Sequence, residues 1–268
     1  MPSKKKQSKK WAVILGASSG FGAATSLELA KSGFNIFGVH FDRRAAMPSI
    51  RKLRSKLRAA GAKELYFNIN AADDEKRENA LLNLKEETKG QKHPVKLLMH
   101  SLAFGSLVPY VGKKGENDIL KKQLELTIDV MANSLVYWTQ ALISHHLIGA
   151  GGQILSMTSA GSHVVWHAYG AVSAAKAALE SHTRQLAVEL TDRKIAVNCI
   201  QAGVTDTPAL RKIPSNEKII ETALRINPSG RLTRPQDVAK IITMIANHST
   251  SWMTGNIIRV DGGEDITG

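Results

Sequence analysis

Cysteine is nearly absent from this chain, since Cys199 is the only one in 268 residues. A lone cysteine excludes an internal disulfide and fits a reducing compartment, so we expect a cytoplasmic protein with Cys199 in its core. A membrane-spanning run of about 20 apolar residues is also missing. Residues 1–10 are basic but lack the apolar centre of a secretory signal, and we interpret them as a flexible tail.

Acidic residues are scarce relative to basic ones: 23 Asp and Glu stand against 36 Lys and Arg, for a net charge of +13. Five of the cations lie in residues 51–58, which have the pattern of a helix. A solvated helix face is the simplest interpretation, and an acidic protein or nucleic acid partner are the alternatives. Without a zinc spacing, an RNA-binding aromatic motif or a helix-turn-helix signature, we expect no nucleic acid partner. His163 and His167 lack metal-ligand spacing, so we expect no metal site.

Apolar strand-like runs alternate with helical stretches along the rest of the chain. The runs occupy residues 11–17, 34–41, 64–70, 95–101, 152–159, 195–203 and 256–263. Most are free of charge inside, as in strands that helices cover on both faces. The alternation predicts one domain, residues 11–268, with a Rossmann-type doubly wound parallel sheet of about seven strands. Residues 207–231 are the one long irregular stretch and a candidate substrate lid.

The first predicted strand leads directly into a glycine-rich turn and a helix, with the spacing Gly16-x-x-x-Gly20-x-Gly22. In a dinucleotide site these glycines allow a tight turn, a close approach of the pyrophosphate and close packing of the helix. The helix amino terminus supplies N–H donors and a positive dipole, and Ser18 and Ser19 can add hydroxyls. The strand–turn–helix context therefore predicts nucleotide binding.

Several motifs in combination resemble the short-chain dehydrogenase/reductase superfamily. They are the glycine spacing, "YGAVSAAKAALE", "IAVNCIQAGVTDTPAL", "NPSGRLTRPQDVA" and "TGNIIRVDGG", and the resemblance runs from about residue 10 to the carboxyl end. It implies a Rossmann-type fold, a nicotinamide cofactor, and a homotetramer (or dimer) built from paired long helices.

Three departures from ordinary members narrow the resemblance. Residues 100–103 read His-Ser-Leu-Ala where Asn-Asn-Ala-Gly is usual, Met131 stands at the position of the catalytic asparagine, and Tyr169 precedes Lys176 by seven residues instead of four. All three are similar to the enoyl-acyl-carrier-protein reductases of bacterial fatty-acid synthesis, and most to the NADPH-dependent enoyl reductase III type. The resemblance implies reduction of the 2,3 double bond of an enoyl thioester carried by acyl-carrier protein or coenzyme A.

The seven-residue spacing suits that chemistry. On an ideal helix Tyr169 and Lys176 share a face, and the tyrosine lies about 4.5 Å farther along the axis than at a spacing of four. When hydride adds to the β-carbon of an enoyl thioester, negative charge develops on the carbonyl oxygen, several bonds away. A tyrosine farther out is placed to stabilise that enolate. Gly170 can delay the start of the helix, so the sequence leaves this geometry open.

The resemblance also implies the catalytic set, which is Tyr169, Lys176 and Ser159. Lys176 would bind the cofactor ribose hydroxyls. Ser159 lies seventeen residues before Lys176, where an active-site serine is expected. Counting thirteen residues back from Tyr169 instead reaches Ser156, and we prefer Ser159 of the two.

Cofactor preference depends on the end of the second predicted strand. An NAD enzyme has a carboxylate there that accepts from the ribose 2′-hydroxyl, but His40 occupies this position and Asp42 comes two residues later. Arg43 and Arg44 follow, and guanidinium groups suit a 2′-phosphate. We therefore expect NADPH rather than NADH, with a reach of Asp42 to the ribose as the alternative.

Further cofactor contacts are implied along the chain: a side chain of the glycine loop, the adenine-contacting pair after the third strand, and the segments after the fourth and sixth strands. These residues are Phe21, Asn68, Ile69, Ser101, Leu102, Ala103, Gly203, Thr205 and Thr207. Two other functions stay open. One is carbonyl or hydroxyl redox chemistry, on a 3-ketoacyl or other ketone substrate; the other is nucleotide binding without turnover, with a basic partner surface.

Overall fold

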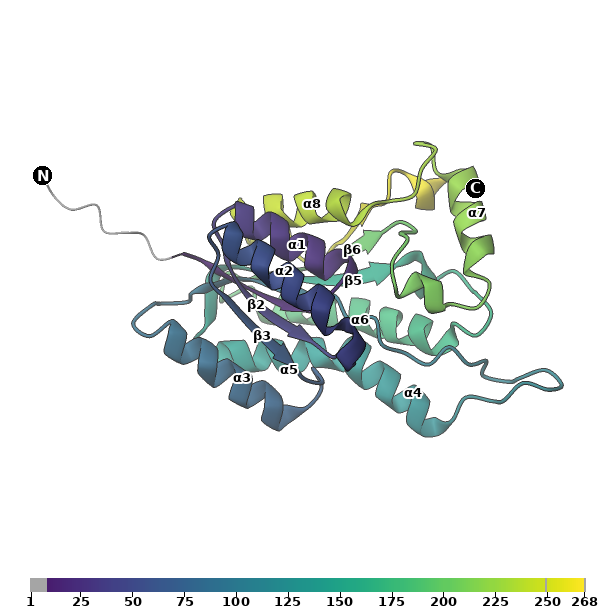
Figure 1. Ribbon diagram of the computed structural model, residues 1–268, viewed down its shortest axis with the longest axis horizontal. Helices are drawn as coiled ribbons and strands as arrows, with labels where there is room; N and C mark the ends of the chain where they lie inside the picture. Colours follow the sequence, from purple (N-terminus) through teal and green to yellow (C-terminus); the bar gives the residue numbers. More distant parts are fainter. Residues whose placement is uncertain (1–8, 249, 268) are drawn as a thin grey trace, which may run out of the picture.

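A seven-stranded parallel sheet forms the centre of the computed structural model, which describes residues 9–248 and 250–267 (Figure 1). The order across the sheet is β3-β2-β1-β4-β5-β6-β7. The strands are β1 (Trp11–Leu15), β2 (Asn35–His40), β3 (Glu64–Asn68), β4 (Val95–His100), β5 (Ile148–Ser159), β6 (Ala196–Ala202) and β7 (Ile257–Val260). All seven lie within the runs predicted from the sequence, except that β5 begins four residues early. The predicted Rossmann-type fold is confirmed.

Helices cover both faces of the sheet, as Figure 1 shows. One face carries α1 (Gly20–Lys31), α2 (Met47–Ala59) and α8 (Pro235–Asn247). The other carries α3 (Asp74–Glu87), α5 (Ser134–Ser144) and α6 (Gly170–Glu189). The remaining helices are α4 (Lys121–Ile128) and α7 (Asn216–Ile226).

The alternation of side chains in β1 explains why two cores form. Val13 and Leu15 pack in the cluster beneath α3, α5 and α6, whereas Ala12 and Ile14 pack in the cluster beneath α1, α2 and α8. Successive side chains of a strand point to opposite faces, so an apolar run of this kind is buried on both sides. The strand order reverses at β1, which places a ligand crevice at the carboxyl ends of the neighbouring strands.

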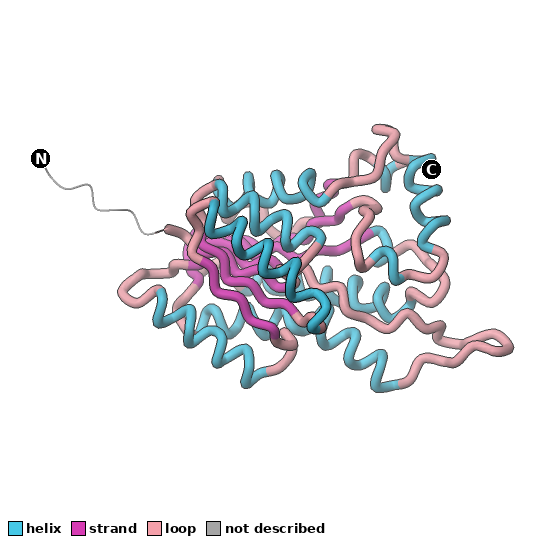
Figure 2. The backbone as a smooth tube through the Cα atoms, viewed as in Figure 1, coloured by secondary structure: helices cyan, strands magenta, loops and turns pink. Residues whose placement is uncertain are grey.

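Residues 207–231 are not irregular as predicted, because they contain a short 3-10 turn at Leu210–Lys212 and the helix α7. Ile219 and Ala223 stand four apart and are buried, so the apolar spacing supports a helix between the proline-containing ends of the segment. The long loop lies elsewhere: residues 101–120 join β4 to α4 and extend beyond the body of the domain (Figure 2).

Three predictions concern features outside the sheet: the basic tail, the membrane span and the metal site. Residues 1–8 of the predicted tail lie outside the described residues, whereas Lys9 Nζ donates to the Gly61 carbonyl oxygen at 2.6 Å. Within the described residues, no helix is long and apolar enough to cross a bilayer, and no cluster of His, Cys, Asp or Glu could hold a metal ion.

Candidate active site

The glycine loop packs so closely against neighbouring backbone that two of its positions have no room for a side chain. Gly16 has a φ of +88°, and a Cβ there would lie 2.1 Å from the Ser101 carbonyl oxygen. A Cβ on Gly22 would lie 2.1 Å from the Gly16 carbonyl oxygen. Helix α1 begins at Gly20, directly after Ser19, with no acidic residue in its first turn. Its positive amino terminus is therefore available to an anion, which fits a pyrophosphate.

One large cavity, of about 680 Å³, opens at the carboxyl ends of β4, β5 and β6. Its lining is mainly apolar and includes Leu107, Met131 and, from α7, Ile219. Ten of the catalytic and cofactor-binding residues predicted from the sequence line it: Phe21, Ser101, Leu102, Ala103, Ser159, Tyr169, Lys176, Gly203, Thr205 and Thr207. The structure thus brings segments from four parts of the chain around one space of a size suited to a small-molecule site.

The lysine of the predicted pair lies in the wall of this cavity. Lys176 is 7% exposed, and its Nζ donates to the Met157 carbonyl oxygen at 2.7 Å. Burial lowers the pKa of Lys176 to about 8, and the nearby Cys199 and Glu180 oppose that shift. An ammonium this buried gains from any further acceptor that enters the cavity.

Tyr169 precedes the helix instead of lying within it, since α6 begins at Gly170 and Tyr169 is its N-cap. Burial raises the pKa of the Tyr169 phenol. A Cβ on Gly161 would lie 2.5 Å from Tyr169 Cε1 and 3.2 Å from Ser159 Oγ, so both side chains flank the same backbone. The phenol therefore stays protonated at neutral pH and can donate a hydrogen bond into the cavity.

The two candidate serines lie in different surroundings. Ser159 lines the cavity, and its buried Oγ has no hydrogen-bond partner among the described residues. Ser156 lies in the interior instead, where its Oγ contacts Thr183 Oγ1 and Cys199 Sγ, each at 3.0 Å. An unpartnered buried hydroxyl beside a phenol fits a ligand carbonyl, and only Ser159 offers one.

Met131 and His100, two of the departures from ordinary family members, lie in different surroundings. Met131 lies in a π-helical turn, Asp129–Asn133, between α4 and α5, and contributes its side chain to the cavity. His100 lies beneath, fully buried, with Nε2 2.9 Å from Ser134 Oγ. Burial, reinforced by the charge of Lys176, lowers the pKa of His100 to about 3. His100 is therefore a neutral interior side chain.

The residues expected at the adenosine end do not line the cavity but gather at the ends of β2 and β3. His40 Nδ1 lies 3.1 Å from Asp42 Oδ2, and the Asn68 side chain forms two hydrogen bonds with the Asp42 backbone. Arg43 and Arg44 are exposed, and neither forms an ion pair within the described part of the chain. Ile69 follows, with its N–H donating to the His40 carbonyl oxygen at 2.8 Å.

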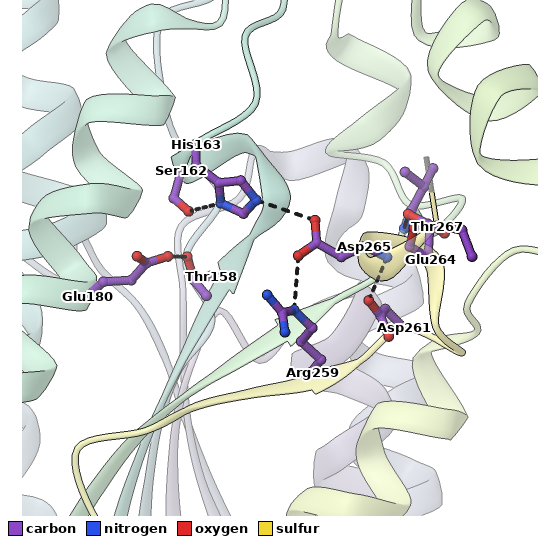
Figure 3. Close-up of polar contacts among 10 residues, drawn as sticks. Thr158, Ser162, His163, Glu180, Arg259, Asp261, Glu264, Asp265 and Thr267 are labelled. Carbon is purple, nitrogen blue, oxygen red and sulfur yellow. Dashed lines mark hydrogen bonds and ion pairs between the residues drawn. The ribbon is translucent and has the colours of Figure 1, made fainter. Parts of the chain in front are cut away.

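A polar group at the cavity rim was not predicted from the sequence. Asp265 Oδ1 lies 3.3 Å from His163 Nε2, and its Oδ2 accepts from Arg259 Nε at 2.9 Å (Figure 3). Figure 3 also shows Glu180, one turn after Lys176, accepting from Thr158 Oγ1 at 2.5 Å. These partners lie up to 102 residues apart in the chain, so no local motif signals them.

The basic stretch 51–58 is partly neutralised. Arg54 and Arg58 both donate to the carboxylate of Glu64 on β3, at 2.8 and 2.6 Å. Arg51 and Lys52 are exposed and form no ion pair within the described residues. The cations of this stretch that are open to a partner are therefore Arg51, Lys52 and Lys56.

Residues 16–264 match a family model described as Enoyl-(Acyl carrier protein) reductase. A 3-oxoacyl-(acyl-carrier-protein) reductase FabG of Pseudomonas aeruginosa is 27% identical over 257 residues, with 95% of this chain and 96% of the relative covered. An enoyl-(acyl-carrier-protein) reductase (NADH) FabI of Aquifex aeolicus is 26% identical over 240 residues, with 90% of this chain and 86% of the relative covered.

Solved structures share the fold. The crystal structure of an enoyl-(acyl-carrier-protein) reductase (NADH) from Aquifex aeolicus superposes with a TM-score of 0.80 at 23% identity, covering 97% of both chains. A short chain dehydrogenase from Burkholderia cenocepacia in complex with NADP has a TM-score of 0.79 at 22% identity, covering 96% of this chain and 98% of the other. At these identities the likeness concerns the fold alone.

Proposed function

This chain belongs to the short-chain dehydrogenase/reductase family, in the group described as enoyl-(acyl carrier protein) reductase, and we propose that it reduces the 2,3 double bond of an enoyl thioester with NADPH. The membership makes it an NAD(P)H-dependent oxidoreductase. One observation carries the choice of substrate: Tyr169, seven residues before Lys176, lies at the head of α6 and lines the same apolar cavity as the lysine.

The residues present fit a dinucleotide. The tight backbone at Gly16 and Gly22 and the free amino terminus of α1 suit the pyrophosphate, and Lys176 would donate to ribose hydroxyls. Two features support NADPH. Arg43 and Arg44 are exposed and unpaired within the described residues, whereas the carboxylate of Asp42 is engaged by His40.

When bound, the reduced nicotinamide supplies a hydride, which the β-carbon of the thioester accepts. Tyr169 Oη keeps its proton, because burial raises its pKa, and donates a hydrogen bond to the thioester carbonyl oxygen as the enolate forms. Ser159 Oγ is a second available donor beside it. Lys176 would hold the ribose, and its ammonium would add positive charge to the cavity that both side chains line. A water molecule entering the open side of the cavity would give the α-carbon of the enolate its proton and leave as hydroxide, which completes the reduction while Tyr169 keeps its own proton.

The apolar part of the cavity suits an acyl chain. Ile219 and Ala223 of α7 contribute apolar side chains to its lining, so α7 would cover the substrate as a lid. We propose acyl-carrier protein or coenzyme A as the carrier and a homotetramer as the assembly. The place of action is the cytoplasm, consistent with a buried, unpaired Cys199.

The experiment that tests this function follows the absorbance of NADPH and NADH with crotonyl and acetoacetyl thioesters. We expect oxidation of NADPH with the crotonyl substrate and a slower reaction with NADH. Robust turnover of acetoacetyl thioester with crotonyl thioester inert would reject enoyl reduction.

Turnover of acetoacetyl thioester alone would instead support the second candidate function, which is reduction of a 3-ketoacyl thioester. The similarity to FabG favours it, at 27% identity over 95% of this chain. The apolar Met131 at the position of the usual catalytic asparagine counts against it, since a thioether provides neither the donor nor the strong acceptor of an amide.

A further inference from the structure

The end of β2 holds a carboxylate that a neighbouring histidine engages. His40 is 5% exposed, and its Nδ1 lies 3.1 Å from Asp42 Oδ2. Burial lowers the pKa of His40 although Asp42 opposes the shift, which favours a neutral imidazole. An ionised carboxylate can only accept, so in the neutral ring Nδ1 carries the proton and donates to Asp42.

The backbone of Asp42 is held as well. Its N–H donates to Asn68 Oδ1 at 2.9 Å, and its carbonyl oxygen accepts from Asn68 Nδ2 at 3.0 Å. The Asp42 side chain is still 28% exposed, so it lies at the surface and is restrained there by His40. Arg43 and Arg44 follow in the same loop with exposed side chains.

We propose that His40 sets the cofactor preference by holding the Asp42 carboxylate away from the ribose, as a positioning residue for the proposed nicotinamide cofactor. A carboxylate at the end of the second strand accepts from the 2′-hydroxyl of NADH. The same charge repels the 2′-phosphate of NADPH. Held at the His40 ring, the Asp42 carboxylate is withdrawn from the 2′ position, so it no longer accepts from a 2′-hydroxyl and its repulsion of a 2′-phosphate is weakened by distance. The charges of Arg43 and Arg44 then dominate that position.

The proposal is tested by direct binding of NADPH and NADH, followed by cofactor fluorescence, in a set of matched variants. His40→Leu removes the donor and keeps the site apolar, so the ratio of NADH affinity to NADPH affinity rises about tenfold, which equals about 1.4 kcal/mol. His40→Asn retains an N–H donor and keeps the wild-type ratio. In the double variant His40→Leu, Asp42→Asn, the ratio stays at the wild-type value, because residue 42 no longer carries a negative charge that could move toward the ribose.

An unchanged ratio in folded His40→Leu overturns the proposal, and so does a rise that survives Asp42→Asn. Should His40→Leu fail to fold, nitrogen-15 NMR of the wild-type histidines decides: the proposal requires the Nδ1–H tautomer for His40, and an Nε2–H tautomer rejects it. The proposed reaction fails in a different way. Absence of thioester reduction, or tighter NADH binding by the wild type, contradicts that function without altering the ratio between variants.

Discussion

At the scale of single residues, the proposed reduction depends on the hydroxyl of Tyr169. The Tyr169→Phe variant keeps the ring but loses one oxyanion donor, which typically costs about 2.7–4 kcal/mol in the barrier. We expect turnover of crotonyl thioester to fall by about 10²–10³-fold with NADPH affinity nearly unchanged. Steady-state kinetics and cofactor titration measure both quantities.

The matched control is Tyr110→Phe. The Tyr110 ring packs near Gly170, next to Tyr169 in the chain, but Tyr110 does not line the main cavity. Removing the Tyr110 hydroxyl should leave the turnover of crotonyl thioester close to that of the wild type. Full activity in Tyr169→Phe would show that the phenol has no part in the reaction.

The Lys176→Ala variant should behave differently from Tyr169→Phe. It should weaken cofactor binding as well as turnover.

The buried His100 should make the free energy of unfolding depend on pH. Its pKa falls from the usual 6.5 to about 3 on folding, so the unfolded chain binds the proton first as the pH drops. Neutral His100 therefore contributes its full share to the free energy of unfolding above pH 6.5. That contribution decreases as the pH falls from 6.5 toward 3. The slope is at most about 1.4 kcal/mol per pH unit.

His100→Gln should therefore flatten the dependence of unfolding free energy on pH between 6 and 4, measured by urea denaturation. His248→Gln is the control, since His248 is exposed, and it should keep the wild-type slope. Equal slopes in wild type and His100→Gln would contradict the buried neutral state of His100.

At the scale of elements, sequence patterns predicted the strands and the glycine turn but missed features that depend on distant contacts. Each apolar run between helical stretches became a strand, because only a sheet covered on both faces buries such a run. The π-helical turn at Asp129–Asn133 interrupts an otherwise helical pattern, so periodicity alone does not predict it. The pairing of His163 with Asp265 requires the folded chain, since 102 residues separate them.

Helix α7 gives a prediction about chain length. Ile219 is buried and lines the cavity, so Ile219→Ala removes apolar contact with an acyl chain. We expect kcat/KM for a long-chain enoyl thioester to fall by about 10-fold or more, since such contacts are worth about 1–3 kcal/mol. The four-carbon crotonyl substrate has less apolar chain to offer α7, so its kcat/KM should change less.

Leu224→Ala on the same helix is the control, because Leu224 is 44% exposed and does not line the cavity. Equal losses for long and short substrates in Ile219→Ala would show that α7 does not contact the acyl chain. Competition between substrates of different length measures the effect directly.

At the scale of the whole molecule, the net charge of +13 suits an acidic carrier. We expect charge reversal at Arg51 and Lys52 to raise KM for carrier-bound crotonyl substrate and to reduce its salt sensitivity. The coenzyme A substrate should be unaffected. Arg54 and Arg58 are unsuitable for this test, since reversing them also breaks their ion pairs with Glu64.

The control reverses Lys85 and Lys92, which are exposed in and beyond α3 and give the same change in net charge. An equal increase in KM from both double variants would attribute the effect to net charge, and no increase from either would reject docking on α2. Light scattering under the same conditions tests the proposed homotetramer.

The central claim is that this site reduces a carbon–carbon double bond and not a carbonyl group. The most direct measurement offers crotonyl and acetoacetyl thioesters together, at equal concentration, with limiting NADPH, and identifies the products by mass spectrometry. The account predicts that butyryl thioester dominates and that Tyr169→Phe suppresses it. A mixture dominated by 3-hydroxybutyryl thioester would contradict the account, because the phenol would then serve a carbonyl carbon reduced directly by the cofactor.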